Sequence, residues 1–130
     1  MVLPDTSVWV DFSRRGMAGE AAALRELLDG GEVATCGPVS AELLAGAEGE
    51  VAERMRQTLS SLPWAELDPV GWQEVGAAAR ILRGSGQVLP LTDVAIAVAA
   101  ARGSCALWSF DADFERIAPL LDGLDLYRPG

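Results

Sequence analysis

The sequence of 130 residues contains no histidine, and all ten of its basic residues are arginine, so lysine is absent as well. Without histidine the chain cannot form a Ser–His–Asp or Cys–His catalytic set, and it lacks a principal ligand of zinc sites. Without lysine it does not match phospho-acceptor receiver domains or phosphohydrolases with an aspartyl nucleophile. The latter also need a second acid that Asp5-Thr6-Ser7 does not supply. Carboxylates are therefore the main acid–base groups that remain.

Cysteines and long apolar runs are scarce too. Cys36 and Cys105 lie in separate apolar segments without CxxC spacing, so each is expected to be a small buried apolar residue. The longest apolar candidate, residues 94–101, is far shorter than the roughly eighteen residues of a membrane span. The N-terminus carries Asp5 and Asp11 instead of the basic residues of a secretory signal. We therefore expect a cytoplasmic protein with no membrane partner.

Size and charge limit the remaining possibilities. Half of the residues are apolar, which is enough for one buried core and predicts a single domain over residues 1–130. The net charge of −9 argues against broad electrostatic binding of nucleic acid and favours a basic protein partner. Nucleic acid is still possible as a substrate, because acids gathered around cations present less negative charge. Arginine is the side chain best shaped to bind phosphate.

Short apolar runs alternate with helical patterns along the chain. Strands are predicted at residues 2–4, 32–36, 105–109 and 124–126, with 63–67 as an extended connection or a further strand. Helices are predicted from a Thr6 or Ser7 cap to residue 15, and at about 21–28, 38–47, 51–62, 69–84 and 91–102, with a short helix opening at Asp111. The alternation predicts an α/β fold with a mostly parallel sheet of about 4–5 strands, covered by helices on both faces.

Five acidic residues stand at the ends of apolar runs: Asp5, Glu42, Asp93, Asp111 and Asp113. An ionised carboxylate in an apolar context is costly unless something compensates its charge. In parallel sheets, ligands bind beyond the carboxyl ends of the strands. Asp5 and Asp111 directly follow predicted strands, whereas Glu42 and Asp93 lie near helix starts. We therefore expect these four carboxylates to converge at one edge of the sheet.

Each acid also has a purely structural interpretation. Asp5, Asp93 and Asp111 could each cap a helix or complement its dipole, with Asp113 in the same first turn as Asp111. Glu42 could be a solvated helix residue, although it lies beyond the first turn and capping does not explain it. A Toprim-type nuclease could use Glu42 with Asp111 and Asp113, but it would leave Asp5 and Asp93 unexplained. The functional interpretation depends on the agreement of four positions.

Converging carboxylates without histidine point to a hard divalent cation. Mg²⁺ is bound by one or two carboxylates, several waters and substrate phosphate oxygens. Two such ions about 3.5–4 Å apart can hold the attacking and leaving oxygens of a phosphodiester displacement. An all-carboxylate set suits Mg²⁺ or Mn²⁺ better than zinc or copper. The sequence therefore predicts metal-assisted chemistry on a phosphate.

Four motifs in the same order resemble those of the PIN-domain endoribonucleases, and among them the VapC-type toxins of bacterial toxin–antitoxin pairs. They are Val2-Leu3-Pro4-Asp5-Thr6-Ser7, Ser40-Ala41-Glu42-Leu43, Asp93-Val94-Ala95-Ile96-Ala97 and Leu107-Trp108-Ser109-Phe110-Asp111-Ala112-Asp113-Phe114. The first resembles the D-T-S motif of the family's opening strand, the third its D-x-x-I-A, and the last its closing T-x-D-x-D-F. Their order and spacing match over essentially the whole chain.

The resemblance implies catalytic roles for Asp5, Glu42, Asp93 and Asp111, and metal ligation by Asp5, Asp93 and Asp111 with Asp113 as an auxiliary ligand. The metal would be Mg²⁺, with Mn²⁺ as a possible substitute. Thr6 and Ser109 would orient the substrate; Ser109 keeps the hydroxyl of the threonine that is usual in the family, so its local hydrogen bonding is expected to survive. Pro4 replaces a more usual β-branched residue and cannot donate to a sheet ladder, so strand pairing is expected to be affected there.

The resemblance further implies an RNA substrate, a homodimer, and a small antitoxin whose C-terminal segment occludes the acidic site in a hetero-oligomer. The alternative is a catalytically weak PIN-fold module that binds or scaffolds other molecules, since fold alone does not determine function.

Overall fold

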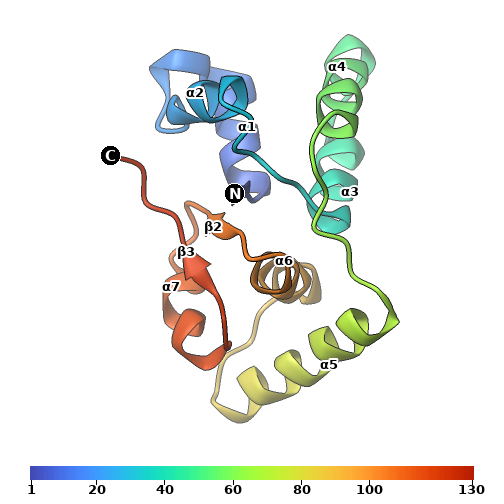
Figure 1. Ribbon diagram of the computed structural model, residues 1–130, viewed down its shortest axis with the longest axis vertical. Coiled ribbons are helices and arrows are strands. Elements are labelled where there is room, and N and C mark those ends of the chain that lie inside the picture. Colours follow the sequence, from blue (N-terminus) through green and yellow to red (C-terminus); the bar gives the residue numbers. More distant parts are fainter.

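The computed structural model describes all residues from 1 to 130, and its centre is a small parallel sheet (Figure 1). Strands β1 (Val2–Pro4), β2 (Ala106–Trp108) and β3 (Asp125–Leu126) lie in the order β1-β2-β3. Leu3 is in register with Leu107, and Leu107 with Leu126. The α/β class and the parallel sheet are as predicted, but the sheet has three strands instead of the 4–5 that the apolar runs indicated.

The two other predicted strands join the sheet through single bridges only. Val33 bridges Val2, and Trp64 bridges Thr35, both in parallel orientation. Residues 32–36 and 63–67 therefore extend the sheet on the β1 side without forming regular ladders.

Pro4 gives a physical reason for this weak pairing. The backbone N–H of Val2 donates to the carbonyl of Glu32, and the N–H of Ala34 donates to the carbonyl of Val2. The backbone N–H groups of every second residue in a strand point to the same neighbouring strand. Pro4 is therefore the next residue of β1 whose N–H would donate to residues 32–36. It has no N–H, and the ladder toward residues 32–36 stops there. On the other side, the N–H of Asp5 still bonds to the carbonyl of Trp108, so the pairing with β2 is intact.

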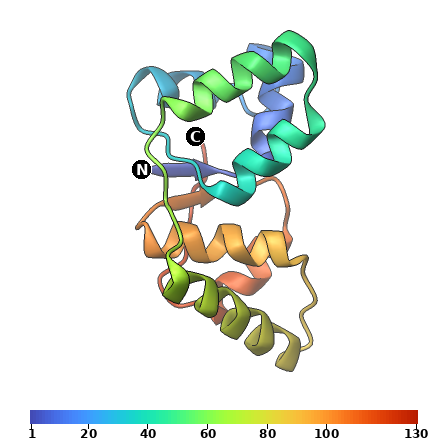
Figure 2. The same ribbon diagram turned by 90° about the vertical axis from the view of Figure 1, so that its right-hand side faces the viewer.

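The helices lie close to their predicted positions. They are α1 (Thr6–Arg15), α2 (Ala23–Asp29), α3 (Gly37–Gly46), α4 (Gly49–Ser60), α5 (Pro69–Gly84), α6 (Leu91–Arg102) and α7 (Asp113–Ile117), with 3-10 turns at Gly16–Ala18 and Ala118–Leu120. No helix is long and apolar enough to cross a bilayer. Figure 2 shows the sheet between two groups of helices, with α1 to α4 on one face and α5 to α7 on the other.

Helix α6 is the most deeply buried element. All residues from Val94 to Ala100 are buried, many of them alanines that allow close packing against the sheet and α5. A helix that is apolar on all sides belongs in the core. Asp93 lies in the first turn of this helix, so its carboxylate is carried by one of the most firmly packed parts of the molecule.

Candidate active site

The carboxylate of Asp5 is buried at the turn between β1 and α1. It is the N-cap of α1, which confirms its structural interpretation and not the alternative caps Thr6 or Ser7. Its Oδ1 accepts hydrogen bonds from the N–H of Val8 at 3.3 Å and the hydroxyl of Ser7 at 2.5 Å. Its Oδ2 accepts from the hydroxyl of Ser109 at 2.5 Å. Burial raises the pKa of Asp5, and these hydrogen bonds partly offset that rise.

The loop after β2 is tied to the same carboxylate. The backbone N–H of Asp111 donates to the Ser109 oxygen at 2.9 Å, and the N–H of Phe110 donates to the Ser7 oxygen at 3.1 Å. The exposed carboxylate of Asp111 accepts from the N–H of Asp113 at 2.9 Å. The prediction that Asp111 is the cap of this helix is wrong, because Ala112 is the N-cap of α7 and no side chain caps it; Asp111 instead accepts the N–H of Asp113 and lies beside Ser109, which holds Asp5.

Glu42 is exposed on α3 and is held by a side chain from another helix. The hydroxyl of Thr6, at the start of α1, donates to Oε1 of Glu42 at 2.8 Å. This hydrogen bond from another helix argues against the interpretation of Glu42 as a merely solvated helix residue. Thr6 and Ser109, which were predicted to orient the substrate, thus donate to two of the predicted catalytic acids.

The negative charges of the other acids contribute to a raised pKa of Asp93. It is half-buried, and burial is the main reason that its pKa is raised; the negative charges of Glu42, Asp111 and Asp5 raise it further, in that order of importance. None of the four acids takes part in an ion pair. Asp93 therefore lies within electrostatic reach of the other three predicted catalytic carboxylates, and none of the four has an arginine partner.

Asp113 differs from this group. Its carboxylate forms an ion pair with Arg116 on the same short helix. This local pairing satisfies Asp113 within α7.

The donor set fits a hard divalent cation that keeps part of its water shell. No three of the acidic or cysteine side chains are close enough to surround an ion by themselves. Mg²⁺ does not need such a cage, because it is commonly held by one or two carboxylates together with waters and phosphate oxygens. All nearby donors are carboxylate or hydroxyl oxygens, as Mg²⁺ and Mn²⁺ prefer. A bound cation would also relieve the repulsion around Asp93.

Ser7 is the part of the site that the sequence reasoning missed. Its hydroxyl was considered only as a possible helix cap, whereas it joins Asp5 to the backbone of Phe110, far along the chain. The available signal was a second hydroxyl residue directly after Asp5-Thr6 in the opening motif, but local spacing does not reveal its long-range partner.

Comparisons with known proteins show the family to which the chain belongs. Residues 2–120 match the family model described as the PIN domain. Ribonuclease VapC11 of Mycobacterium tuberculosis is 30% identical over 123 residues, which cover 91% of this chain and 92% of that protein.

Among solved structures, DNA-bound VapBC from Salmonella typhimurium is 20% identical, with a TM-score of 0.75 and 98% of each chain covered. VapBC-5 from Mycobacterium tuberculosis, a member of the VapBC family of toxin–antitoxin systems, is also 20% identical, with a TM-score of 0.65 and the same coverage. At 20% identity, the similarity to these two structures shows that this chain has the same fold.

The fold is thus that of the PIN-domain proteins. The chain belongs to the PIN-domain family and, within it, to the VapC ribonucleases of toxin–antitoxin systems. Ribonucleases of this kind are generally metal-dependent.

Proposed function

We propose that this chain hydrolyses phosphodiester bonds of RNA with Mg²⁺, which Mn²⁺ can replace. The catalytic acids are Asp5, Glu42, Asp93 and Asp111, and Asp5, Asp93 and Asp111, with Asp113 as the weakest candidate ligand, hold the metal together with waters of its shell. One observation carries the proposal: Asp93 is half-buried, burial and the charges of three other carboxylates raise its pKa, and it has no cationic partner. Such an arrangement is unfavourable alone and becomes favourable when a divalent cation binds.

The chain's own residues supply orientation. When bound, a divalent cation stabilises charge on the phosphate and lowers the pKa of an attacking water. Asp5 is fixed by Ser7 and Ser109, and Glu42 by Thr6. Through these two acids, Thr6 and Ser109 orient the substrate indirectly. Preorganised acids of this kind lower the barrier because they need not rearrange during the reaction.

A groove beside Glu42 supports an antitoxin partner that covers the site. The groove has a volume of about 410 Å³ and lies between α1 and the α3–α4 pair; Val10, Arg14, Glu42, Leu43 and Val51 are among its lining residues. Both apolar and charged side chains line it, which suits an amphipathic segment. A segment in this groove would end at Glu42 and block access to the acids.

A second cavity continues this groove toward α2. It has a volume of about 560 Å³ and shares Ser13, Val51 and Met55 with the first one. Arg25 and Arg54 line it together with apolar side chains. The mixed lining and the continuity of the two cavities favour a peptide over a lone nucleotide. We propose that the antitoxin's C-terminal segment follows both cavities.

The remaining parts of the proposal concern assembly. The whole chain, residues 1–130, forms one PIN domain, which acts as a homodimer in the cytoplasm, where its RNA substrate is found. With the antitoxin it forms a hetero-oligomer. The two solved structures named above are of VapBC proteins, which supports a VapB-like partner for this chain.

The decisive experiment measures RNA cleavage by the purified chain with Mg²⁺, Mn²⁺ or excess chelator. Asp5→Asn and Asp93→Asn are each expected to reduce kcat by at least about 100-fold, since even residues that only support a metal site commonly cost 10–100-fold. Asp122→Asn is the matched control, because Asp122 is exposed and forms no ion pair.

Cleavage that survives both substitutions, or that persists in chelator, would contradict the metal mechanism. A wild-type chain that cleaves no RNA but binds a small protein tightly would instead support the scaffold interpretation.

The antitoxin groove is tested separately with Val51→Arg. The substitution places a long charged side chain where the two cavities meet, so we expect antitoxin affinity to fall by at least about tenfold while RNA cleavage is retained. Val70→Arg on α5 is the control, because Val70 is similarly exposed but lies outside both cavities. Equal affinities of the two variants in a calorimetric titration would place the antitoxin elsewhere.

A further inference from the structure

Two serine hydroxyls from distant segments hold the two oxygens of Asp5. Ser7, in the first turn of α1, donates to Oδ1, and Ser109, just after β2, donates to Oδ2. Each serine oxygen also accepts a backbone N–H from the loop after β2, that of Phe110 for Ser7 and that of Asp111 for Ser109. A carboxylate only accepts and a backbone N–H only donates, so the direction of every bond in this network is determined.

Ser7 does not act as an ordinary residue of a helix start. The cap of α1 is Asp5, which accepts the N–H of Val8. The hydroxyl of Ser7 accepts no N–H of its own helix; it accepts one from Phe110 in another segment. Ser7 therefore couples the turn that carries Asp5 to the loop that carries Asp111.

The network also determines how many positions Asp5 can offer a cation. An ionised carboxylate has about four lone-pair positions, two on each oxygen. On Oδ1 both are used, by Ser7 and Val8. On Oδ2 one is used, by Ser109. One position remains, on Oδ2.

We propose that Ser7 is a positioning residue which, together with Ser109, makes Asp5 a monodentate metal ligand through Oδ2. This inference rests on the proposed metal-dependent nuclease activity and adds a residue to its machinery. Ser7 acts through Asp5 and does not itself touch the substrate. Loss of its hydroxyl frees a position on Oδ1 and releases Phe110, so both the orientation of Asp5 and its distance from the Asp111 loop become variable.

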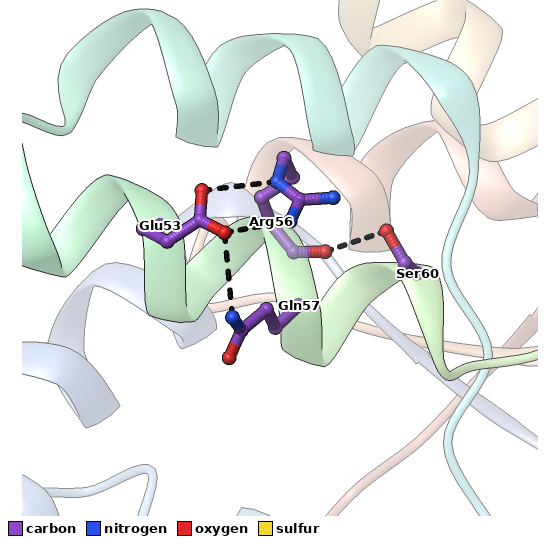
Figure 3. Close-up of polar contacts among 4 residues, drawn as sticks. All are labelled: Glu53, Arg56, Gln57 and Ser60. Atoms are coloured by element: carbon purple, nitrogen blue, oxygen red, sulfur yellow. Dashed lines mark hydrogen bonds and ion pairs between the residues drawn. The ribbon is translucent and has the colours of Figure 1, made fainter.

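The test compares Ser7→Ala with Ser60→Ala in the full chain. Ser60 is the matched control because its hydroxyl, like that of Ser7, donates one hydrogen bond, to the carbonyl of Arg56 at 2.7 Å, but on the outer side of α4 (Figure 3). The readouts are Mn²⁺ affinity, from the electron paramagnetic resonance signal of free Mn²⁺, and kcat and KM on an RNA oligonucleotide. Ser7→Ala is expected to lose about 10–100-fold in Mn²⁺ affinity and in kcat, as for other residues that orient metal ligands. KM for the RNA should change by less than about threefold, because a positioning role acts on the reacting acids and not on RNA binding.

Further variants separate positioning from folding. Ser109→Thr keeps the hydroxyl and is expected to retain Mn²⁺ affinity, whereas Ser109→Ala is expected to lose it as Ser7→Ala does. Ser7→Cys keeps the shape with a weak donor and serves if Ser7→Ala does not fold in circular dichroism. In the double variant Ser7→Ala with Ser109→Ala, the loss of Mn²⁺ affinity should differ from the product of the two single losses, since both serines act on one carboxylate.

The outcomes distinguish the two proposals. Mn²⁺ affinity and kcat of Ser7→Ala equal to those of Ser60→Ala would overturn the positioning role while leaving the nuclease intact. A wild-type chain that binds Mn²⁺ but cleaves no RNA would overturn the proposed function alone, and the Mn²⁺ affinities would still decide the role of Ser7. A wild-type chain that binds no Mn²⁺ would overturn both.

Discussion

Two carboxylates in this protein have opposite surroundings. Glu53, on the outer side of α4, accepts hydrogen bonds from Arg56 and Gln57, and the contact with Arg56 lowers its pKa (Figure 3). Asp93, at the start of α6, has no arginine partner, and burial together with neighbouring carboxylates raises its pKa. Arg56 compensates the negative charge of Glu53, whereas no cationic side chain compensates that of Asp93.

The same contrast divides the acids of the whole chain. Every ion pair uses an acid outside the set of four: Asp11, Glu53, Asp68, Glu74, Asp113 and Glu115. The arginines of this acidic protein therefore neutralise structural acids and leave the catalytic candidates unpaired. By this criterion Asp113 belongs with the structural acids, in spite of its place in the closing motif.

The largest expected difference between the two groups is their response to Mg²⁺. If Asp93 belongs to the metal site, Mg²⁺ at about 100 times its Kd stabilises the folded chain by about 2.7 kcal/mol, because the ion binds only the folded state. Asp93→Asn should abolish most of this gain, and Glu53→Gln should keep it. Thermal unfolding of the three proteins with and without Mg²⁺ measures the effect. Equal Mg²⁺ responses in both variants would remove Asp93 from the site.

A smaller difference is expected in the pH dependence of metal-free stability. The pKa of Asp93 is raised above 3.8, so its ionisation disfavours the folded state, and the stability it contributes is lost as pH rises through the raised value. The pKa of Glu53 is lowered below 4.5, so its contribution is present above 4.5 and is lost as pH falls through the lowered value.

Unfolding in chelator across this pH range tests these signs. Relative to the wild type, Asp93→Asn should gain melting temperature as pH rises from about 4 toward 7, and it should gain nothing below pH 4. Glu53→Gln should lose melting temperature only at the higher pH values. The same sign in both variants would show that the surroundings of the two carboxylates are not opposite.

The sequence could predict the acids better than their partners. Asp5 was open to two interpretations, as a helix cap and as a metal ligand; it is the cap of α1, and that role leaves one oxygen position for a metal. The interpretations did not exclude each other. Local spacing identifies a helix start after Asp5, but it contains no information on the bond between Ser7 and Phe110, which depends on how β1 and β2 pair.

The sheet illustrates the same limit. Apolar runs located every segment that pairs, yet they could not distinguish a full strand from a single bridge. That distinction depends on which neighbour a given N–H faces, as at Pro4, and the direction of an N–H follows from register. The partner of Asp113, in contrast, stands three residues away on one helix face, where spacing alone could have identified Arg116.

The smallest expected effect concerns Asp113 and would sharpen the division of the acids. Asp113→Asn removes the ion pair with Arg116, which is largely exposed, so we expect a stability loss of about 0.5 kcal/mol or less. Because this acid is satisfied within α7, kcat for RNA should fall by less than about threefold, whereas Asp111→Asn should lose at least about 100-fold. Denaturant unfolding and RNA cleavage of both variants measure the two effects. A large loss of kcat in Asp113→Asn with unchanged stability would mean that Arg116 releases this carboxylate when the metal binds, and Asp113 would then join the catalytic acids.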